Sequence, residues 1–188
     1  MVLGLFRQRR EEWAHALYAA IVAAARAPAL YLDYAVPDTV EGRFESLALH
    51  TGLVVRRLAS EGERRREEAR ILSEEFFANM DQSLRELGVG PNGVPKRMRG
   101  LAAAFYGRLE AYGRALETGD EPGLAAALGR NVYRQTPAPP EALRLARYAI
   151  TAAARLAALP AADIVAGALA FPDPAAVPMP LPEAADAG

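Results

Sequence analysis

Large apolar residues recur every three or four positions along most of this chain, and this spacing is the strongest constraint on its fold. Trp13, Leu17 and Ile21 begin the pattern, and similar sets follow as far as residue 159. Such a period places apolar side chains on one face of an α-helix, whereas a half-buried strand would need strict alternation. The sequence shows no strand pattern of that kind. It therefore predicts an all-α protein.

Proline and glycine divide the pattern into about six helices. We expect these helices over residues 9–27, 44–58, 63–87, 95–116, 120–132 and 140–159. Pro28 ends the first helix, and Asp120 is a good cap for the fifth because its carboxylate can accept a backbone N–H. Residues 28–42 contain two prolines and a turn-like Val-Pro-Asp-Thr stretch, which predicts an ordered loop after the first helix.

The chain length of 188 residues fits one domain with a core of its own. We expect a single helical bundle over residues 1–171. Residues 172–188 are rich in proline and alanine, and no Lys or Arg follows Arg155, so we expect a disordered tail there. The predicted core members are Trp13, Phe44, Leu47, Phe76, Met80, Phe105 and Tyr112.

Charge and composition exclude several classes of protein. The net charge is −1, so no global excess of positive charge would hold DNA, and we expect no DNA partner. The absence of cysteine excludes disulfide scaffolds and thiolate metal sites. The apolar run at residues 1–6 is too short for a signal peptide, and the alanine-rich stretches are interrupted by charges. We expect a soluble or peripheral protein.

Two motifs resemble those of enzymes or metal sites. Residues 88–93 match the dinucleotide pattern G-x-G-x-x-G, but a helix precedes them where that motif needs a strand, so a helix end and turn fit better. Glu12 and His15 have the spacing of a carboxylate-bridged iron site, yet His50 lacks the matching glutamate. We therefore expect no catalytic residue, no metal and no cofactor.

His50 is the more notable of the two histidines. Arg43, His50 and Arg57 are spaced seven residues apart, which places them along one edge of the second predicted helix. One interpretation is a flank of long side chains beside the core, and the other is a functional site. Farther along, Asp81 and Arg85 have the spacing of a surface ion pair.

Positive charge gathers at the start of the fourth predicted helix, where Lys96, Arg97 and Arg99 lie. The positive end of the helix dipole makes cations unfavourable there by about 0.3–1 kcal/mol each. Neutralisation by Glu86 or another carboxylate would explain the cluster. A docking patch for an acidic partner would explain it equally well.

Several segments together closely resemble the ubiquinol-cytochrome c chaperone family between about residues 18 and 134. The segments that carry the resemblance include Val36-Pro-Asp-Thr-Val-Glu-Gly-Arg-Phe44, Leu49-His50, Met80-Asp81, Leu84-Arg-Glu-Leu-Gly-Val-Gly90, Val94-Pro-Lys-Arg97, Ala104-Phe-Tyr-Gly-Arg108 and Arg130-Asn-Val-Tyr133. No single motif decides the matter, but their order and spacing together are specific. One departure is Pro91-Asn92, where we expect an acidic residue in the family.

The resemblance implies a non-enzymatic, all-helical chaperone that binds newly made cytochrome b and supports assembly of the ubiquinol-cytochrome c reductase. Further partners implied by mitochondrial members are the ribosome exit region and a small partner protein. Since no mitochondrial presequence is recognisable, we expect a bacterial protein of the cytoplasm, with peripheral contact to the inner membrane as an option.

A groove between helices with a polar rim is the expected binding site. The candidate partner-binding residues are Val36, Pro37, Asp38, Thr39, Gly42, Arg43, His50, Asp81, Arg85, Glu86, Lys96, Arg97 and Arg108. One alternative is a small helical haem-binding protein or enzyme that uses His50, which would require an apolar pocket and an open ring nitrogen. Another is a structural subunit whose alanine-rich faces pack in an oligomer.

Overall fold

The computed structural model describes residues 2–177, with side chains described from residue 12 onward, and this part of the chain is helical without strands. The six long helices are α1 (Val2–Ala25), α3 (Val40–Ala59), α4 (Glu63–Glu86), α5 (Val94–Thr118), α6 (Glu121–Leu128) and α7 (Pro140–Ala158). The prediction of an all-α bundle is confirmed. α6 continues into a π-helical turn, η1 (Gly129–Tyr133), so the predicted fifth helix is one continuous segment with two geometries.

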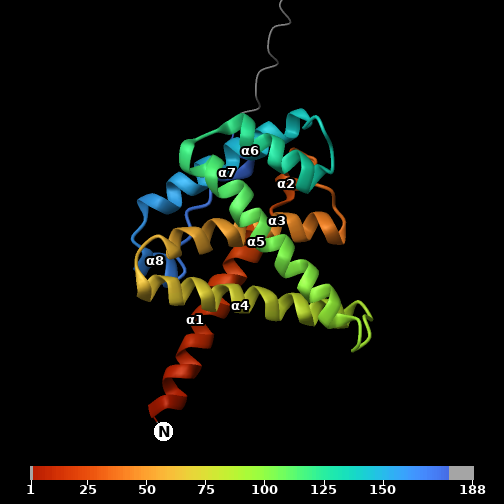
Figure 1. Cartoon of the computed structure of the whole chain (residues 1–188). Coiled ribbons are helices and arrows are strands. Elements are labelled where there is room, and N and C mark those ends of the chain that lie inside the picture. The colour runs from red at the N-terminus through yellow and green to blue at the C-terminus, as the bar shows by residue number, and fades with distance from the viewer. Residues whose placement is uncertain (1, 178–188) are drawn as a thin grey trace, which may run out of the picture.

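Helix α3 lies at the centre of the bundle. It packs against α1, α4, α5 and α7 (Figure 1), and almost every side of it is buried, from Glu45 to Val55. Thr39 caps this helix by accepting a hydrogen bond from the Gly42 N–H at 3.1 Å. Asp120 caps α6 in the same way through Gly123, at 2.9 Å, as the sequence predicts.

Two apolar clusters form the core. The first joins α1, α3, α4 and α5, with Phe76 stacked on Phe105 at a centroid distance of 4.7 Å. The second joins α2, α6 and α7 around Tyr34, Tyr148 and Leu128. Among the predicted core residues, Leu47, Phe76, Phe105 and Tyr112 are buried, whereas Trp13, Phe44 and Met80 are partly exposed at the edge of the first cluster.

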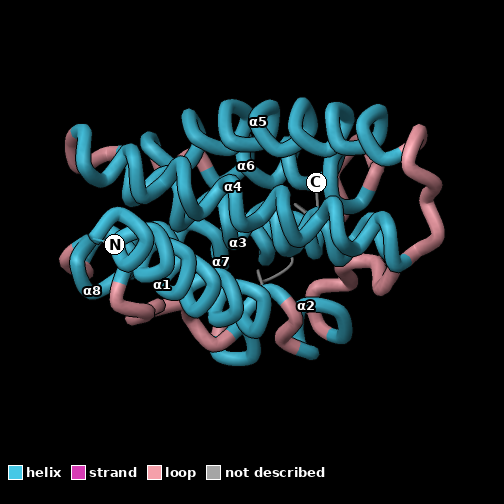
Figure 2. The backbone as a smooth tube through the Cα atoms, turned by 90° about the horizontal axis from the view of Figure 1, so that it is seen from below, coloured by secondary structure: helices cyan, strands magenta, loops and turns pink. Residues whose placement is uncertain are grey.

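Two short helices are absent from the prediction. α2 (Pro28–Leu32) begins with the proline that ends α1, since proline fits the first helical turn. α8 (Ala161–Val165) likewise follows Pro160. The tube view in Figure 2 shows α2 as a separate turn beside the main bundle. Residues 28–42 are therefore not a simple loop, because their first five residues form a turn of helix.

The predicted start of the disordered tail at Pro172 is wrong for residues 172–177. The 3-10 turn η2 (Pro174–Ala176) lies against α2, and Tyr34 donates a hydrogen bond to the Pro174 carbonyl at 2.7 Å. Arg144 donates to the Val177 carbonyl at 3.3 Å. Prolines cannot extend a helix, but their carbonyls remain strong acceptors for buried donors. Residues 178–188 of the predicted tail lie outside the described residues.

Candidate functional site

An apolar groove of about 210 Å³ opens where four helices meet: the end of α1, the first turns of α3, the last turns of α4 and the start of α5. Its apolar lining consists of Ala25, Val40, Phe44, Leu47, Met80, Leu84, Leu87 and Leu101. We call this feature the client groove. In Figure 1 the start of α3, the end of α4 and the start of α5 lie together on one side of the molecule.

Four polar residues complete the lining of the client groove. Arg26 follows the last turn of α1, and Arg43 lies on α3, where its Nε donates to the Asp38 carboxylate at 2.6 Å. Asn79 accepts a hydrogen bond from the Tyr18 hydroxyl at 3.2 Å, which fixes the orientation of its side-chain amide. Ser83 lies one turn farther along α4. The groove thus combines apolar walls with a small number of polar groups, as binding sites commonly do.

A second depression of about 300 Å³ adjoins the client groove and shares Arg26 and Arg43 with it. Its other lining residues are Pro28, Tyr31, Leu32 and Asp38. Tyr31 is fixed by a hydrogen bond from its hydroxyl to the Ala25 carbonyl at 2.9 Å. Because the two depressions share both arginines, they form one continuous surface around the end of α1.

Exposed apolar side chains concentrate on this surface. Four large hydrophobic residues of the described chain are exposed, and three of them border the two depressions: Leu32 at 80%, Val40 at 60% and Leu87 at 60%. Single exposed leucines need no explanation, but exposed apolar residues gathered around an apolar depression with a polar rim are characteristic of an interaction site. The fourth, Tyr106, lies outside both linings and packs beside Phe77.

Neither a metal-binding cluster nor a membrane-spanning helix is found in the described part of the chain. Residues 12–177 contain no cluster of three or more His, Asp or Glu side chains that could hold a metal ion. No helix within the described residues has both the length and the apolar character needed to cross a bilayer.

Comparison with known proteins decides the family. A sequence model described as "Ubiquinol-cytochrome C chaperone" matches residues 32–171, which include α3, α4, α5 and most of the client groove. The chain belongs to this family.

Solved and curated relatives agree with the ubiquinol-cytochrome c chaperone family. The crystal structure of the Cbp3 homolog from Brucella abortus superposes with a TM-score of 0.83 and 40% sequence identity, covering 95% of this chain and 100% of that one. Ubiquinol-cytochrome c reductase complex assembly factor 1 of Mus musculus is 29% identical over 115 residues, and that of Homo sapiens is equally similar. This chain is covered to 61%, but the match spans only 39% and 38% of the mouse and human proteins.

The resemblance drawn from residues 18–134 is therefore confirmed, and the structure shows how the family segment at residues 36–43 is held. Val36 is buried, Thr39 caps α3, and Asp38 pairs with Arg43. A Cβ atom on Gly42 would lie 1.9 Å from the Pro37 carbonyl oxygen, so the close approach of these two backbones requires glycine. This segment supports the groove, and Val40 and Arg43 are the members that line it.

His50 is not at the surface. It is fully buried, with Nδ1 2.7 Å from the Ser46 carbonyl and Nε2 2.8 Å from the Tyr148 hydroxyl. Burial lowers the pKa of His50 from 6.5 to about 4, so the ring is neutral at pH 7. Both ring nitrogens are engaged, and the open nitrogen that haem ligation would require is missing. The interpretation of His50 as a partner-binding residue is wrong, because α3 turns that edge toward α7 and Phe171.

Arg108 is likewise a structural residue. Its guanidinium forms a two-pronged ion pair with Glu45, which is only 6% exposed, and also donates to the Ala104 carbonyl at 2.9 Å. Burial raises the pKa of Glu45, and the positive charge of Arg108 opposes that rise. The expectation that Arg108 forms a rim for partners fails because its partner is a buried carboxylate 63 residues away in sequence.

The positively charged start of α5 remains at the surface. Lys96, Arg97 and Arg99 are exposed, and none of them forms an ion pair with a side chain of residues 12–177. Glu86 instead accepts a hydrogen bond from Gln82 at 2.8 Å, and Asp81 pairs with Arg85 at 2.6 Å, as the spacing predicts. Neutralisation by Glu86 or Asp81 is therefore absent. Arg97 lies one turn before Leu101, on the side of α5 that lines the client groove.

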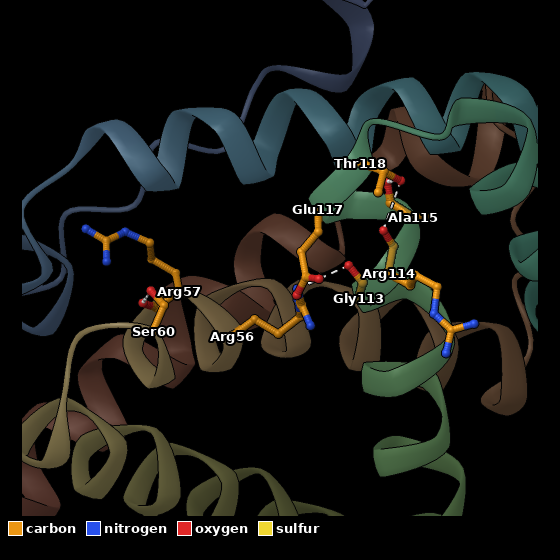
Figure 3. A network of polar contacts seen from close by, with 8 residues as sticks. All are labelled: Arg56, Arg57, Ser60, Gly113, Arg114, Ala115, Glu117 and Thr118. Carbon is orange, nitrogen blue, oxygen red and sulfur yellow. Dashed lines mark hydrogen bonds and ion pairs between the residues drawn. The ribbon is translucent and has the colours of Figure 1, made fainter.

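Arg56 and Arg57 are neighbours in sequence but fasten α3 to different helices. Arg56 donates to the Gly113 carbonyl at 3.2 Å and to Glu117 at 2.8 Å on α5, whereas Arg57 donates to the Leu156 and Leu159 carbonyls at the end of α7. Figure 3 shows the two guanidinium groups pointing in different directions. Arg57 thus caps α7, which explains its place on the edge shared with His50.

Sequence reasoning missed most of the groove. Val40, Leu84, Leu87 and Leu101 were not among the candidates, nor was Arg26. The available signal was the position of Val40 and Leu87 at helix ends, where an apolar residue is less easily buried than on the middle of an amphipathic face.

Proposed function

We propose that this protein is a non-enzymatic assembly factor that binds newly made cytochrome b and supports assembly of the ubiquinol-cytochrome c reductase. The observation that carries the proposal is the client groove, an apolar surface with exposed leucine and valine side chains in a chain of the ubiquinol-cytochrome c chaperone family. The names of the mouse and human relatives support the same pathway of assembly.

The size of the groove favours side chains of a protein over a free ligand. Its volume of about 210 Å³ is below the range of about 300–1,000 Å³ that is typical for small-molecule and cofactor sites. It suits a few large apolar side chains that project from one face of a helix, which is how amphipathic helices dock into grooves. A membrane-protein segment awaiting insertion or haem offers such side chains, and covering them prevents aggregation.

The rim supplies the polar part of the interaction. Arg26 and Arg43 line the groove beside its apolar walls, and Arg97 lies one turn before the wall residue Leu101. A partner's carboxylate would be attracted more strongly beside these walls than in open water. Such charges accelerate encounter and select partners more than they add affinity. We place this activity in the bacterial cytoplasm at the inner membrane, with the ribosome exit region or a small partner protein as further contacts.

The test uses cells whose own copy is replaced by variants. Leu84→Ser with Leu101→Ser changes the groove walls, and Lys96→Gln with Arg97→Gln changes the rim. We expect the wall variant to lower spectroscopically measured cytochrome b several-fold per folded molecule. The rim variant should lose salt-sensitive association with cytochrome b. Its melting temperature should equal that of the wild type or be higher, because the cations that it lacks oppose the helix dipole.

The matched control is Tyr106→Ser, which removes an exposed apolar side chain outside the groove. It should leave cytochrome b at the wild-type amount. Normal cytochrome b in cells that carry a folded wall variant would contradict the proposal. A rim variant that is unstable, yet assembles normally per folded molecule, would show that these cations have a structural role only.

A further inference from the structure

The exposed apolar residues around the client groove come from three separate helix ends. Leu32 is the last residue of α2, Val40 is the first residue of α3, and Leu87 directly follows α4. In Figures 1 and 2 the turn between α4 and α5 lies on the same side of the molecule as α2. These three residues, which we call the apolar tips, therefore stand around the groove rather than along one helix face.

Positive charge accompanies the apolar tips. Arg26 and Arg43 lie where the two depressions meet, and Lys96, Arg97 and Arg99 follow the turn after Leu87. Except for Arg43, which pairs with Asp38, these cations form no ion pair with a side chain of residues 12–177. Three carboxylates of this edge, Asp33, Glu41 and Glu86, form no ion pair within residues 12–177, and they are fewer than the four cations Arg26, Lys96, Arg97 and Arg99 that form none either. This edge is positive although the chain as a whole carries a net charge of −1.

We propose that this edge docks the protein on an anionic lipid bilayer, with Leu32, Val40 and Leu87 inserted among the headgroups and Arg26, Lys96 and Arg97 on the phosphates. The inference extends the proposed function, because docking would hold the mouth of the client groove against the membrane in which a client segment lies. Vesicle binding itself requires no client, so the two proposals can fail separately.

The combination of tips and cations favours a bilayer over a protein partner for this edge. The affinity of a peripheral protein for a bilayer has two contributions. One increases with the apolar area that is inserted, and the other comes from the attraction of cations to anionic lipid. A stable protein interface needs roughly 800 Å² per partner with a packed apolar centre. The tips are single residues separated by arginines, and their centre is a groove. Since no described helix can span a membrane, contact through these residues would be peripheral.

The test measures sedimentation of the purified full chain with vesicles of phosphatidylcholine, alone or with one third phosphatidylglycerol. We expect binding to the anionic vesicles that weakens as salt is raised. Arg26→Gln with Arg97→Gln should weaken binding by about fivefold per charge removed. Leu32→Ser with Val40→Ser and Leu87→Ser should weaken it by about tenfold or more, because the inserted apolar area is lost.

Matched controls carry the same changes elsewhere. Arg114→Gln with Arg155→Gln removes two exposed arginines that lie outside the two depressions, and Tyr106→Ser removes the fourth exposed apolar residue. Both controls should bind vesicles as the wild type does. Melting temperatures of all variants show whether each is folded, and the tip variant should remain folded because its three side chains are exposed.

Three outcomes would overturn the inference: a wild-type protein that stays in the supernatant with both kinds of vesicle, equal losses in the controls, or a tip variant that binds as well as the wild type. If the tip variant binds vesicles normally but lowers cytochrome b in cells, the edge contacts a protein. If the wall variant Leu84→Ser with Leu101→Ser binds vesicles normally and assembles cytochrome b normally, the proposed function fails while the docking inference stands.

Discussion

His50 and Tyr148 form a buried hydrogen bond of 2.8 Å between α3 and α7, 98 residues apart in sequence. The Ser46 carbonyl can only accept, so Nδ1 of His50 carries the proton and Nε2 accepts from the Tyr148 hydroxyl. The neutral ring thereby satisfies two polar groups inside the core. This arrangement explains why a histidine can lie on the most buried helix of the bundle.

The buried His50 predicts a loss of stability on acidification. Its pKa is about 4 in the folded chain and about 6.5 when unfolded, so the unfolded chain binds more protons between these values. The contribution of neutral His50 to the free energy of unfolding is complete above pH 6.5. It is lost as the pH falls toward 4, by up to about 1.4 kcal/mol per pH unit. Urea unfolding of wild type and His50→Gln across this range measures it. Equal slopes for the two proteins would contradict the assignment, because glutamine does not titrate.

Removing one partner of the Glu45–Arg108 pair should be strongly destabilising. Arg108→Leu leaves the Glu45 carboxylate buried without a counter-charge, which typically costs about 3–5 kcal/mol. The double variant Glu45→Leu with Arg108→Leu should recover most of this loss, since a buried pair adds little net stability compared with apolar residues. Denaturant unfolding of both variants checks the prediction. A loss below about 1 kcal/mol in Arg108→Leu would show that Glu45 is solvated.

Two glycines should respond to alanine in opposite directions. Gly42→Ala should lower the free energy of unfolding by about 1–3 kcal/mol, because the new Cβ would lie 1.9 Å from the Pro37 carbonyl oxygen. Gly107 lies inside α5 with nothing within 4 Å of a Cβ, so Gly107→Ala should raise stability by about 0.5–1 kcal/mol. Thermal and urea unfolding distinguish them. Equal effects would mean that Pro37 can move away.

Ending the chain at Phe171 should weaken the fold. The truncation removes the Pro174 and Val177 carbonyls, which accept hydrogen bonds from Tyr34 and Arg144. Each buried donor left unpaired costs about 1–3 kcal/mol. A chain that ends at Val177 is the reference, and Tyr34→Phe tests the first bond alone. Identical unfolding curves for the chains ending at Phe171 and Val177 would show that residues 172–177 do not contribute.

The groove was only partly predictable, because its lining combines residues whose roles differ by context. The lining residue Arg43 is predicted by its place in the 36–43 segment, and Arg97, which lies one turn before the lining residue Leu101, by its conflict with the helix dipole. Leu84 and Leu101 looked like ordinary core residues, since periodicity marks a buried face without saying whether a neighbour covers all of it. The position of Arg26, two residues before Pro28, indicated only the end of the first helix. Only the meeting of four helices makes these residues one surface.

The sequence by itself determined the six long helices and several of their ends, although not the short helices α2 and α8. The bounds of α4 between Glu63 and the Gly88 turn, and the cap of α6 at Asp120, depend on neighbours within four residues, and such contacts are readable along the chain. Only the tertiary structure decided the roles of polar residues. Arg97, Arg108 and His50 are alike in being polar residues on amphipathic helices. Yet Arg97 forms no ion pair within residues 12–177, Arg108 is paired inside the fold and His50 is fully buried. The difference comes from partners such as Glu45 and Tyr148, which lie far away in sequence and meet these residues only when the helices pack.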